Sequence, residues 1–425
     1  LPPKDAVRIE EFINYFDYDY PAPTGTDPFS TNCELSVCPW NEKHELLLVG
    51  LQGRKIDLAQ LPPNNLVFLA DVSGSMNSPR KLPLLKASLR LLVNNLRPED
   101  RVALVVYAGA AGLVLDSTPG TDRQKILEAI DNLNAGGSTA GGAGIKLAYQ
   151  VAKENFMPKG NNRIILATDG DFNVGQSSDA DLTRLVEEKR DGGVYLTVLG
   201  LGRGNYKDSK MEKLADKGNG NYAYVDNIRE AKKALVTEVG GTLFTIAKDV
   251  KLQIEFNPAT VSSYRLIGYE NRMLKAEDFN NDKKDAGELG AGHRVTALYE
   301  IVRVGSEESV AKVDKLKYQK KVKLIKSKDL LTLKLRYKAP DETESQLITR
   351  TVKAQDITPK EPSDNWVFAS AVAEFALLVR DSEHKGSASF EATLERARQA
   401  RGKDEHGYRA EFAQLIEEAD LLARR

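Results

Sequence analysis

The chain has 425 residues, of which 60 are basic and 61 are acidic, so its formal net charge is −1. This length exceeds what one ordinary hydrophobic core supports, and we expect two or three domains. The balanced charge gives no general attraction to phosphate and so argues against a nucleic-acid partner. No apolar run approaches the roughly 20 residues that span a bilayer, and the 41% hydrophobic content is typical of a soluble globular protein.

The features that bear on the compartment are the first residue and the two cysteines. The chain begins at Leu1 rather than at a methionine. We expect that the natural N-terminus has been removed by processing or by design, with a signal peptide or lipid anchor as the candidate for the lost segment. Cys33 and Cys38 lie on one predicted strand at an odd offset, which points them to opposite faces. This favours packed free thiols, and a disulfide across a distorted turn is the alternative.

The first part of the chain mixes one helix with strands. Residues 5–16 carry apolar side chains at helical spacing and are predicted to form an amphipathic helix. Segments 31–38 and 45–52 alternate well enough to form an antiparallel pair of strands. These strands have no obvious partner in the neighbouring sequence.

From residue 64 to about 240 the pattern changes to strands that alternate with helices, which predicts a doubly wound, mostly parallel α/β sheet. The expected strands are 65–71, 101–107, 112–116, 163–168, 194–200 and 221–225. The expected helices are 80–96, 121–133, 141–155, 179–191, 207–217 and 228–240. The gap between the second and third strands is too short for a crossover helix, so the third strand should be an antiparallel edge hairpin.

After about residue 248 the sequence becomes rich in strand-like runs, at 250–256, 263–269, 293–304, 330–337 and 346–353. The orphan strands near the N-terminus are expected to complete this β-rich domain, so that the α/β domain is an insertion in it. Two or three amphipathic helices close the chain from residue 363 onward. The predicted domains are 1–63 with 246–360 as the β-rich part, 64–245 as the six-stranded α/β domain, and 361–425 as a helical segment.

Two charged stretches in the β-rich part invite a functional interpretation. The acidic loop 277–285 resembles a calcium loop, but Lys283 stands where an EF-hand needs glycine, and a plain turn is favoured. The lysine-rich stretch 312–328 could dock an acidic surface or anionic lipid. A solvated loop and strand edge is favoured there, because lysine at strand edges guards against aggregation.

The stretch Asp71-Val72-Ser73-Gly74-Ser75-Met76 follows directly after a short apolar run, 66–70, which fits a buried parallel strand. Its carboxylate and two hydroxyls therefore lie past the carboxyl end of a strand, where open α/β sheets bind ligands. Gly74 permits the sharp turn that lets the three side chains converge. One carboxylate and two hydroxyls suit Mg²⁺ or Mn²⁺ and suit Zn²⁺ poorly. The alternative is an ordinary Asp/Ser turn with a helix cap.

Two later loops are expected at the same edge of the sheet. Thr139 follows a glycine pair and begins a predicted helix, where it could also be a simple N-cap. Asp169 follows the buried strand 163–168, and if that strand neighbours the first one, Asp169 faces Asp71 across the point where strand order reverses. Two carboxylates held together need a cation between them, or one must take up a proton. No Gly-x-x-x-x-Gly-Lys-Ser/Thr motif occurs, so the glycine-rich loop is not a P-loop.

These residues closely resemble the metal-ion-dependent adhesion site of von Willebrand factor A domains. All five positions of that site are present in the right order, namely Asp71, Ser73, Ser75, Thr139 and Asp169. The resemblance implies a Rossmann-like fold and Mg²⁺ or Mn²⁺ bound by the three hydroxyls, with the two carboxylates binding directly or through water. It also implies that a carboxylate from a partner protein takes the sixth position.

The flanking phrases are similar to one subset, the bacterial YfbK-like proteins, along nearly the whole chain. The phrases are Pro3-Lys4-Asp5-Ala6-Val7-Arg8-Ile9-Glu10-Glu11, Cys38-Pro39-Trp40-Asn41, Gly136-Gly137-Ser138-Thr139-Ala140-Gly141-Gly142, Thr168-Asp169-Gly170-Asp171-Phe172-Asn173 and Val295-Thr296-Ala297-Leu298-Tyr299-Glu300. This resemblance implies a periplasmic or cell-surface bacterial protein, often a lipoprotein, whose C-terminal region has no assigned role.

The leading hypothesis is a non-enzymatic, metal-dependent protein-binding or adhesion module whose partner offers an Asp or Glu carboxylate. A metal-dependent hydrolase is the first alternative. Against it, none of the four histidines is near the cluster in sequence, there is no His-Glu-x-x-His or Gly-x-Ser-x-Gly motif, and no base stands beside Ser73 or Ser75. An accessory subunit for a partner ATPase is the second alternative, and it would also be non-catalytic.

Overall fold

The computed structural model describes residues 1–57, 61–108, 110–137, 141–170, 179–202, 208–237, 244–270, 273–282, 284, 286–306, 325, 327–340 and 342–424. The chain divides into two compact units. An α/β unit comprises Lys55–Ile246 and Gly287–His293. A β-rich unit comprises Leu1–Arg54, Ala247–Ala286 and Arg294–Arg425. The finer division into four segments stays a prediction.

The α/β unit is built on a six-stranded sheet of order β5-β4-β3-β6-β7-β8. All neighbouring pairs are parallel except β4 and β5, which are antiparallel. The strands are β3 (Asn64–Asp71), β4 (Arg101–Tyr107), β5 (Ala111–Pro119), β6 (Asn161–Thr168), β7 (Val194–Leu201) and β8 (Tyr222–Val225). The predicted doubly wound sheet with an antiparallel edge hairpin is therefore confirmed, and β3 and β6 are neighbours at the reversal of strand order.

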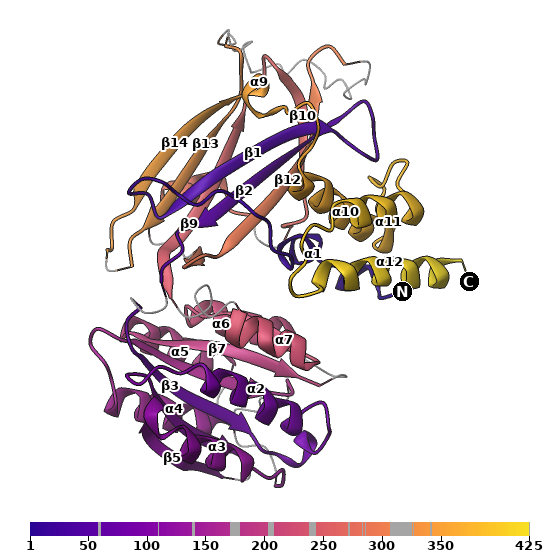
Figure 1. Ribbon diagram of the computed structural model, residues 1–425. Coiled ribbons are helices and arrows are strands. Elements are labelled where there is room, and N and C mark those ends of the chain that lie inside the picture. The colour runs from indigo at the N-terminus through magenta and orange to yellow at the C-terminus, as the bar shows by residue number, and fades with distance from the viewer. Residues whose placement is uncertain are drawn as a thin grey trace. The chain divides into compact units, whose positions relative to one another are not determined.

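Both faces of this sheet are covered by helices (Figure 1). Because side chains alternate along a strand, Leu66 and Phe68 of β3 enter one apolar cluster and Val67 and Leu69 enter the other. One face is covered by α2 (Leu82–Asn94), α3 (Arg123–Asp131) and α7 (Ile228–Lys232), and the other by α4 (Gly141–Glu154), α5 (Asp179–Asp191) and α6 (Asp208–Lys217). Short helical turns are η3 (Gly74–Met76), η4 (Gly120–Asp122) and η5 (Lys233–Thr237).

Outside the six-stranded sheet, the described strands form two four-stranded sheets, which explains why the orphan N-terminal strands exist. One sheet has the order β1-β2-β12-β10 and the other β11-β9-β13-β14. The strands are β1 (Phe29–Val37), β2 (Glu45–Gly53), β9 (Thr245–Phe256), β10 (Val261–Ile267), β11 (Gly287–Gly290), β12 (Arg294–Arg303), β13 (Asp329–Lys338) and β14 (Gln346–Lys353). Because β2 pairs with β12, which follows the α/β part in sequence, the predicted insertion is confirmed.

The two faces of β2 pack against different layers. Leu47 and Val49 enter the core between the two sheets, whereas Leu46 and Leu48 enter a second core beneath the helices. A strand buried on both faces reads as a continuous apolar run, as residues 46–49 do. The helical layer is formed by α1 (Ile9–Asn14), α10 (Asp364–Val379), α11 (Phe390–Gln399) and α12 (Tyr408–Ala423) (Figure 1). The remaining short helices are η1 (Lys4–Ala6), η6 (Ala276–Asn280) and α9 (Ala354–Ile357).

Helix α10 differs from the amphipathic helix that the sequence predicts. Its buried residues occur on every side, because α1 and α11 pack against it and the first sheet lies beneath it. The Trp366 indole donates a hydrogen bond to the Leu46 carbonyl oxygen at 3.0 Å, which ties this helix to β2. The one carboxylate buried in its middle, Glu374, pairs with Arg396 of α11.

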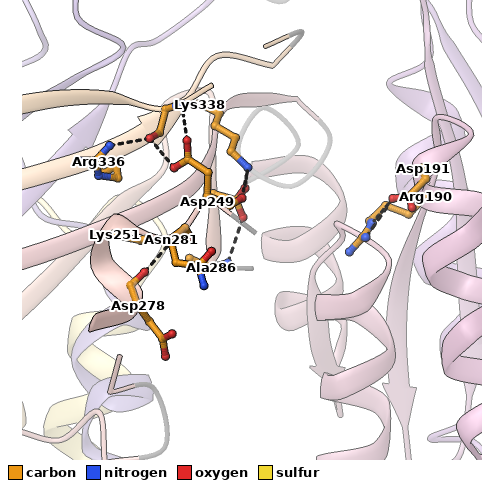
Figure 2. Close-up of polar contacts among 11 residues, drawn as sticks. Arg190, Asp191, Asp249, Lys251, Asp278, Asn281, Ala286, Arg336 and Lys338 are labelled. Atoms are coloured by element: carbon orange, nitrogen blue, oxygen red, sulfur yellow. Dashed lines mark hydrogen bonds and ion pairs between the residues drawn. The ribbon is translucent and has the colours of Figure 1, made fainter. Parts of the chain in front are cut away.

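The described part of the acidic loop, residues 277–282, is held by lysines and agrees with a plain turn (Figure 2), whereas Lys283 and Asp285 lie outside the described residues. The Lys251 ammonium donates to the Asn281 carbonyl oxygen at 2.6 Å. The Lys338 ammonium donates to the Asp282 carbonyl oxygen at 2.8 Å and to the Asp249 carboxylate at 2.6 Å. Two carbonyl oxygens of the loop therefore already accept hydrogen bonds from ammonium groups.

Three further expectations concern the whole chain. Cys33 and Cys38 are both free thiols, as favoured. In the part of the chain that the structure describes, no helix is long and apolar enough to cross a membrane. Most of the lysine-rich stretch 312–328 lies outside the described residues.

Candidate metal centre

Asp71 is the last residue of β3, the strand between β4 and β6 in the sheet. Its side chain is fully buried, at 0% exposure. Oδ1 accepts a hydrogen bond from the Ser73 backbone N–H at 2.8 Å, which fixes the turn that follows the strand. Oδ2 is buried and accepts no hydrogen bond of good geometry from the described residues. A buried carboxylate oxygen without a donor is costly unless another group completes it.

The two serines lie directly beyond this carboxylate. Ser73 precedes the short helical turn Gly74–Met76, and its side chain is 2% exposed. Its hydroxyl lies 3.0 Å from the hydroxyl of Ser75, so the two oxygens converge as the spacing predicts. Ser75 is exposed. The oxygen cluster therefore reaches from the buried Asp71 to the solvent at Ser75.

The glycine-rich loop is hydrogen-bonded to the same turn. The Gly136 N–H donates to the Val72 carbonyl oxygen at 2.7 Å, and the Gly74 N–H donates to the Gly137 carbonyl oxygen at 3.0 Å. This pairing brings the loop that precedes Thr139 beside the Asp71–Ser75 turn. Thr139 itself lies outside the described residues, and its role stays a prediction.

Asp169 follows β6, and its side chain is 4% exposed. Because Ala70 and Ala167 are register partners, the carboxyl ends of β3 and β6 meet at the same edge. Gly170 has φ of +90°, and its N–H donates to the Thr168 hydroxyl at 3.2 Å, which turns the chain sharply after the strand. Of the five predicted positions, the structure therefore brings together Asp71, Ser73, Ser75 and Asp169.

The electrostatics of this edge are those of a buried anionic site. Burial raises the pKa of Asp71, hydrogen bonds from Ser73 lower it, and the nearby Asp169 carboxylate raises it. Burial also raises the pKa of Tyr107 well above its ordinary value, and the Asp71 and Asp169 carboxylates raise it further. The Tyr107 phenol is therefore neutral at physiological pH and can act as a hydrogen-bond donor.

Sequence reasoning missed two residues at this edge. Tyr107 ends β4 and is the register partner of Asp71, so the shared carboxyl edge of parallel strands was a signal that could have found it. Lys81 is the N-cap residue of α2, and its ammonium donates to the Asp169 carboxylate at 2.8 Å. Nothing in the sequence around Lys81 marks it as part of this site, because its partner Asp169 follows β6 and is distant in the chain.

Hydroxyl oxygens are essential to any metal site in this region. Across the described ranges, no group of three or more His, Cys, Asp and Glu side chains is placed to hold a metal ion. The oxygens gathered around Asp71 are carboxylate and hydroxyl oxygens. That donor set is hard and weakly charged, and it fits Mg²⁺ or Mn²⁺ rather than Zn²⁺.

Comparison with known proteins gives the family. The model of the von Willebrand factor type A domain matches residues 65–237, and that of the C-terminal region of "Uncharacterized protein YfbK" matches residues 241–422. A third model, described as von Willebrand factor, matches residues 1–48. The chain is 46% identical to the YfbK protein of Escherichia coli (strain K12) over 431 residues, which cover 99% of this chain and 74% of that protein. The chain belongs to the YfbK family.

Other proteins are less similar to this YfbK-family chain in sequence. Inter-alpha-trypsin inhibitor heavy chain H3 of Bos taurus is 26% identical over 267 residues, which cover 59% of this chain and 30% of that protein. A solved structure of a von Willebrand factor type A protein from Catenulispora acidiphila has a TM-score of 0.46 and 17% identity, covering 92% of this chain and 89% of that one. The family models and the 46% identity to the Escherichia coli protein confirm the family assigned from the sequence, and the von Willebrand A domain coincides with the six-stranded sheet.

Proposed function

We propose that this chain is a metal-dependent protein-binding or adhesion module. Asp71, Ser73, Ser75, Thr139 and Asp169 would hold Mg²⁺ or Mn²⁺ at the carboxyl edge of the sheet. When bound, the ion supplies an electrophilic coordination position that accepts a carboxylate. An Asp or Glu of a partner protein would provide that carboxylate.

The observation that carries the proposal is the state of the Asp71 carboxylate. One of its oxygens is buried with no good hydrogen bond from the described residues. The Ser73 and Ser75 hydroxyls converge beside it at 3.0 Å from each other. Asp169 is near enough for its charge to raise the pKa of Asp71. Two carboxylates and two hydroxyls arranged in this way favour a divalent cation.

The residues of the chain have different roles at such a site. The Ser73 backbone N–H binds Oδ1 of Asp71, whereas Oδ2 accepts no hydrogen bond of good geometry from the described residues. Ser75 is exposed and would form the rim that a partner meets. Because few charged groups surround the ion, its affinity for an outside carboxylate is preserved. Partner binding should then depend on the metal.

We also propose that the chain is not an enzyme and acts on the periplasmic or cell-surface side of a bacterial envelope. Both proposals draw on the resemblance to YfbK-like proteins, and a lipid anchor upstream of Leu1 is the candidate attachment. A metal-dependent hydrolase and an accessory subunit of a partner ATPase are the alternatives. Cell fractionation with an antibody against the chain tests the location, and recovery in the cytoplasm alone would contradict it.

Calorimetric titration with Mg²⁺ and Mn²⁺ tests the metal site directly. Wild type should bind one ion, and Asp71→Asn, which keeps the acceptor for the Ser73 N–H, should lose binding. Asp116→Asn is the matched control, because it removes an exposed carboxylate from β5 of the same sheet. Equal heats of Mg²⁺ or Mn²⁺ binding in wild type and Asp71→Asn would exclude the proposed metal site.

A second experiment tests the bridging role of the metal. Wild type and Asp71→Asn are used as bait in bacterial envelope extract, in Mg²⁺ and in EDTA. A partner captured only by wild type in Mg²⁺ supports the proposal. Capture that persists in EDTA would exclude a metal-bridged contact, and hydrolysis of phosphate esters that disappears in Asp71→Asn would favour the hydrolase.

A further inference from the structure

Lys81 reaches into the candidate metal centre from the start of α2. Its ammonium donates to Oδ2 of Asp169 at 2.8 Å and to the Ser75 carbonyl oxygen at 3.0 Å. Both acceptors belong to segments that are proposed to hold the metal. The side chain of Lys81 is 20% exposed and that of Asp169 is 4% exposed, so the ion pair is largely shielded from water. A shielded pair interacts more strongly than an ordinary surface pair.

The aliphatic part of Lys81 runs over a glycine that leaves room for it. Gly202 directly follows β7 and has φ of +87°. A Cβ atom at this position would lie 2.5 Å from Cε and 3.1 Å from Cγ of Lys81. The Gly202 carbonyl oxygen accepts a hydrogen bond from the Tyr224 hydroxyl of β8. The path of the lysine is therefore shaped by the end of β7 as well as by its own helix.

The backbone of Lys81 is also fixed. Its N–H donates to the Ser78 carbonyl oxygen at 2.9 Å, and its carbonyl oxygen accepts from the Leu85 N–H at 2.8 Å. Leu85 itself is fully buried in the core beneath α2. The fixed backbone of Lys81 and the space over Gly202 together direct the ammonium to Asp169.

We propose that Lys81 is a built-in counter-cation, which neutralises Asp169 when no metal is bound and competes with the divalent ion for that carboxylate. The inference rests on the proposed metal-binding function and adds a residue that sets the affinity of the site. Two carboxylates at one buried edge repel each other unless a cation lies between them. The ammonium supplies a compensating positive charge at Asp169 in the resting protein.

Competition follows from the sign of the charges. A divalent ion coordinated by Asp169 would repel an ammonium that holds the same carboxylate, so Lys81 must release Asp169 as the ion binds. The partial exposure of its flexible side chain gives the ammonium a route to solvent. The apparent affinity for metal is reduced by the fraction of molecules in which Asp169 is already paired.

Calorimetric titration of the full chain with Mg²⁺ tests the inference. Lys81→Met keeps the aliphatic bulk and removes the charge. Arg80→Met is the matched control, because it removes the same charge from an exposed neighbour. We expect Lys81→Met to bind Mg²⁺ about tenfold more tightly than wild type, because a shielded hydrogen bond between charged groups contributes a factor of about this size. Arg80→Met should stay within about twofold of wild type.

Thermal unfolding supplies a second readout that does not require a partner. In EDTA, Lys81→Met should unfold at a lower temperature than wild type, because the two carboxylates lose their counter-cation. The rise in unfolding temperature on adding Mg²⁺ should be larger in Lys81→Met than in wild type. Lys81→Gln replaces Lys81→Met in both measurements where the methionine variant does not fold.

The outcomes separate this inference from the function on which it rests. Unchanged or weaker Mg²⁺ binding in Lys81→Met, while wild type binds and Asp71→Asn does not, overturns the competition and leaves the metal site standing. Absence of Mg²⁺ binding in wild type and in Lys81→Met alike overturns the metal site and the inference with it. Tighter binding in Lys81→Met alone supports both.

Discussion

Asp71 and Tyr107 are register partners at the carboxyl ends of the parallel strands β3 and β4, and the buried phenol lies against the carboxylate. The Val72 N–H donates to the Tyr107 carbonyl oxygen at 3.1 Å, so the backbone on both sides of the pair is fixed. The phenol also lies against the Thr168 hydroxyl at the end of β6. Tyr107 therefore connects three strands beneath the proposed metal.

Tyr107→Phe should weaken metal binding without destroying the fold. Groups that orient a metal ligand from behind typically contribute about tenfold or more to affinity, and loss of the hydroxyl should lower the free energy of unfolding by about 1 kcal/mol. Calorimetry with Mg²⁺ and urea unfolding measure the two effects. Tyr149→Phe is the control, because the buried Tyr149 hydroxyl of α4 has no hydrogen-bond partner among the described residues. It should keep wild-type affinity and equal or higher stability.

The two serines should separate into one structural and one purely metal-binding group. Ser73 is buried and its hydroxyl also bonds to Asp71, so Ser73→Ala should cost about 1 kcal/mol of unfolding free energy in EDTA. Ser75 is exposed, and Ser75→Ala should stay within about 0.5 kcal/mol of wild type in EDTA. Both should lose Mg²⁺ affinity in calorimetry. Wild-type affinity in Ser75→Ala would remove Ser75 from the ligand set.

The sequence was sufficient to place Asp71 and Asp169 because Asp71 ends one buried apolar strand and Asp169 follows another, and the carboxyl ends of parallel strands share one edge. The same periodicity could not find Lys81. Its position depends on where the start of α2 meets the end of β7, a contact between segments far apart in the chain. Local pattern carries no information about such a meeting.

Helix α10 gives a second example of this limit in the fold. Its residues from Trp366 to Val379 suggested an amphipathic helix, yet they are buried on nearly every side. Whether a mostly apolar helix is half or fully covered depends on the layers around it. Here α1 from the N-terminus and α11 from the C-terminus complete the cover. Strand β2 was easier, since its own sequence predicted a strand and only its pairing with β12 needed the distant sequence.

The acidic loop of the β-rich unit should depend on lysine rather than on calcium. Lys338→Met removes the ion pair between Lys338 and Asp249, in which the two side chains are 13% and 16% exposed. It also removes the ammonium that donates to the Asp282 carbonyl oxygen. We expect a loss of about 2 kcal/mol of unfolding free energy. Lys334→Met, on the same strand but in a more exposed pair with Glu255, should cost about 0.5 kcal/mol or less.

Tryptophan fluorescence measures this effect selectively. Trp40 and Trp366 are the chain's two tryptophans, and both lie buried in the β-rich unit. Their urea transition should move to lower concentration in Lys338→Met, and adding Ca²⁺ should not move it in wild type. A calcium-dependent shift in wild type would contradict the assignment of the loop as a lysine-held turn.

The two cysteines should be unreactive in the folded protein. Burial raises the pKa of both Cys33 and Cys38 to about 12. The pKa of a thiol in an unfolded chain is about 8.5. The thiols thus contribute stability that is fully present below about pH 8.5 and is lost as the pH rises from there through about 12. At pH 8, iodoacetamide should modify neither cysteine in the native protein and both after unfolding, with or without reductant, as counted by mass spectrometry. Cys38 is buried and Cys33 is half-buried. Rapid modification of one thiol in the native state, or a requirement for reductant after unfolding, would contradict two shielded free thiols.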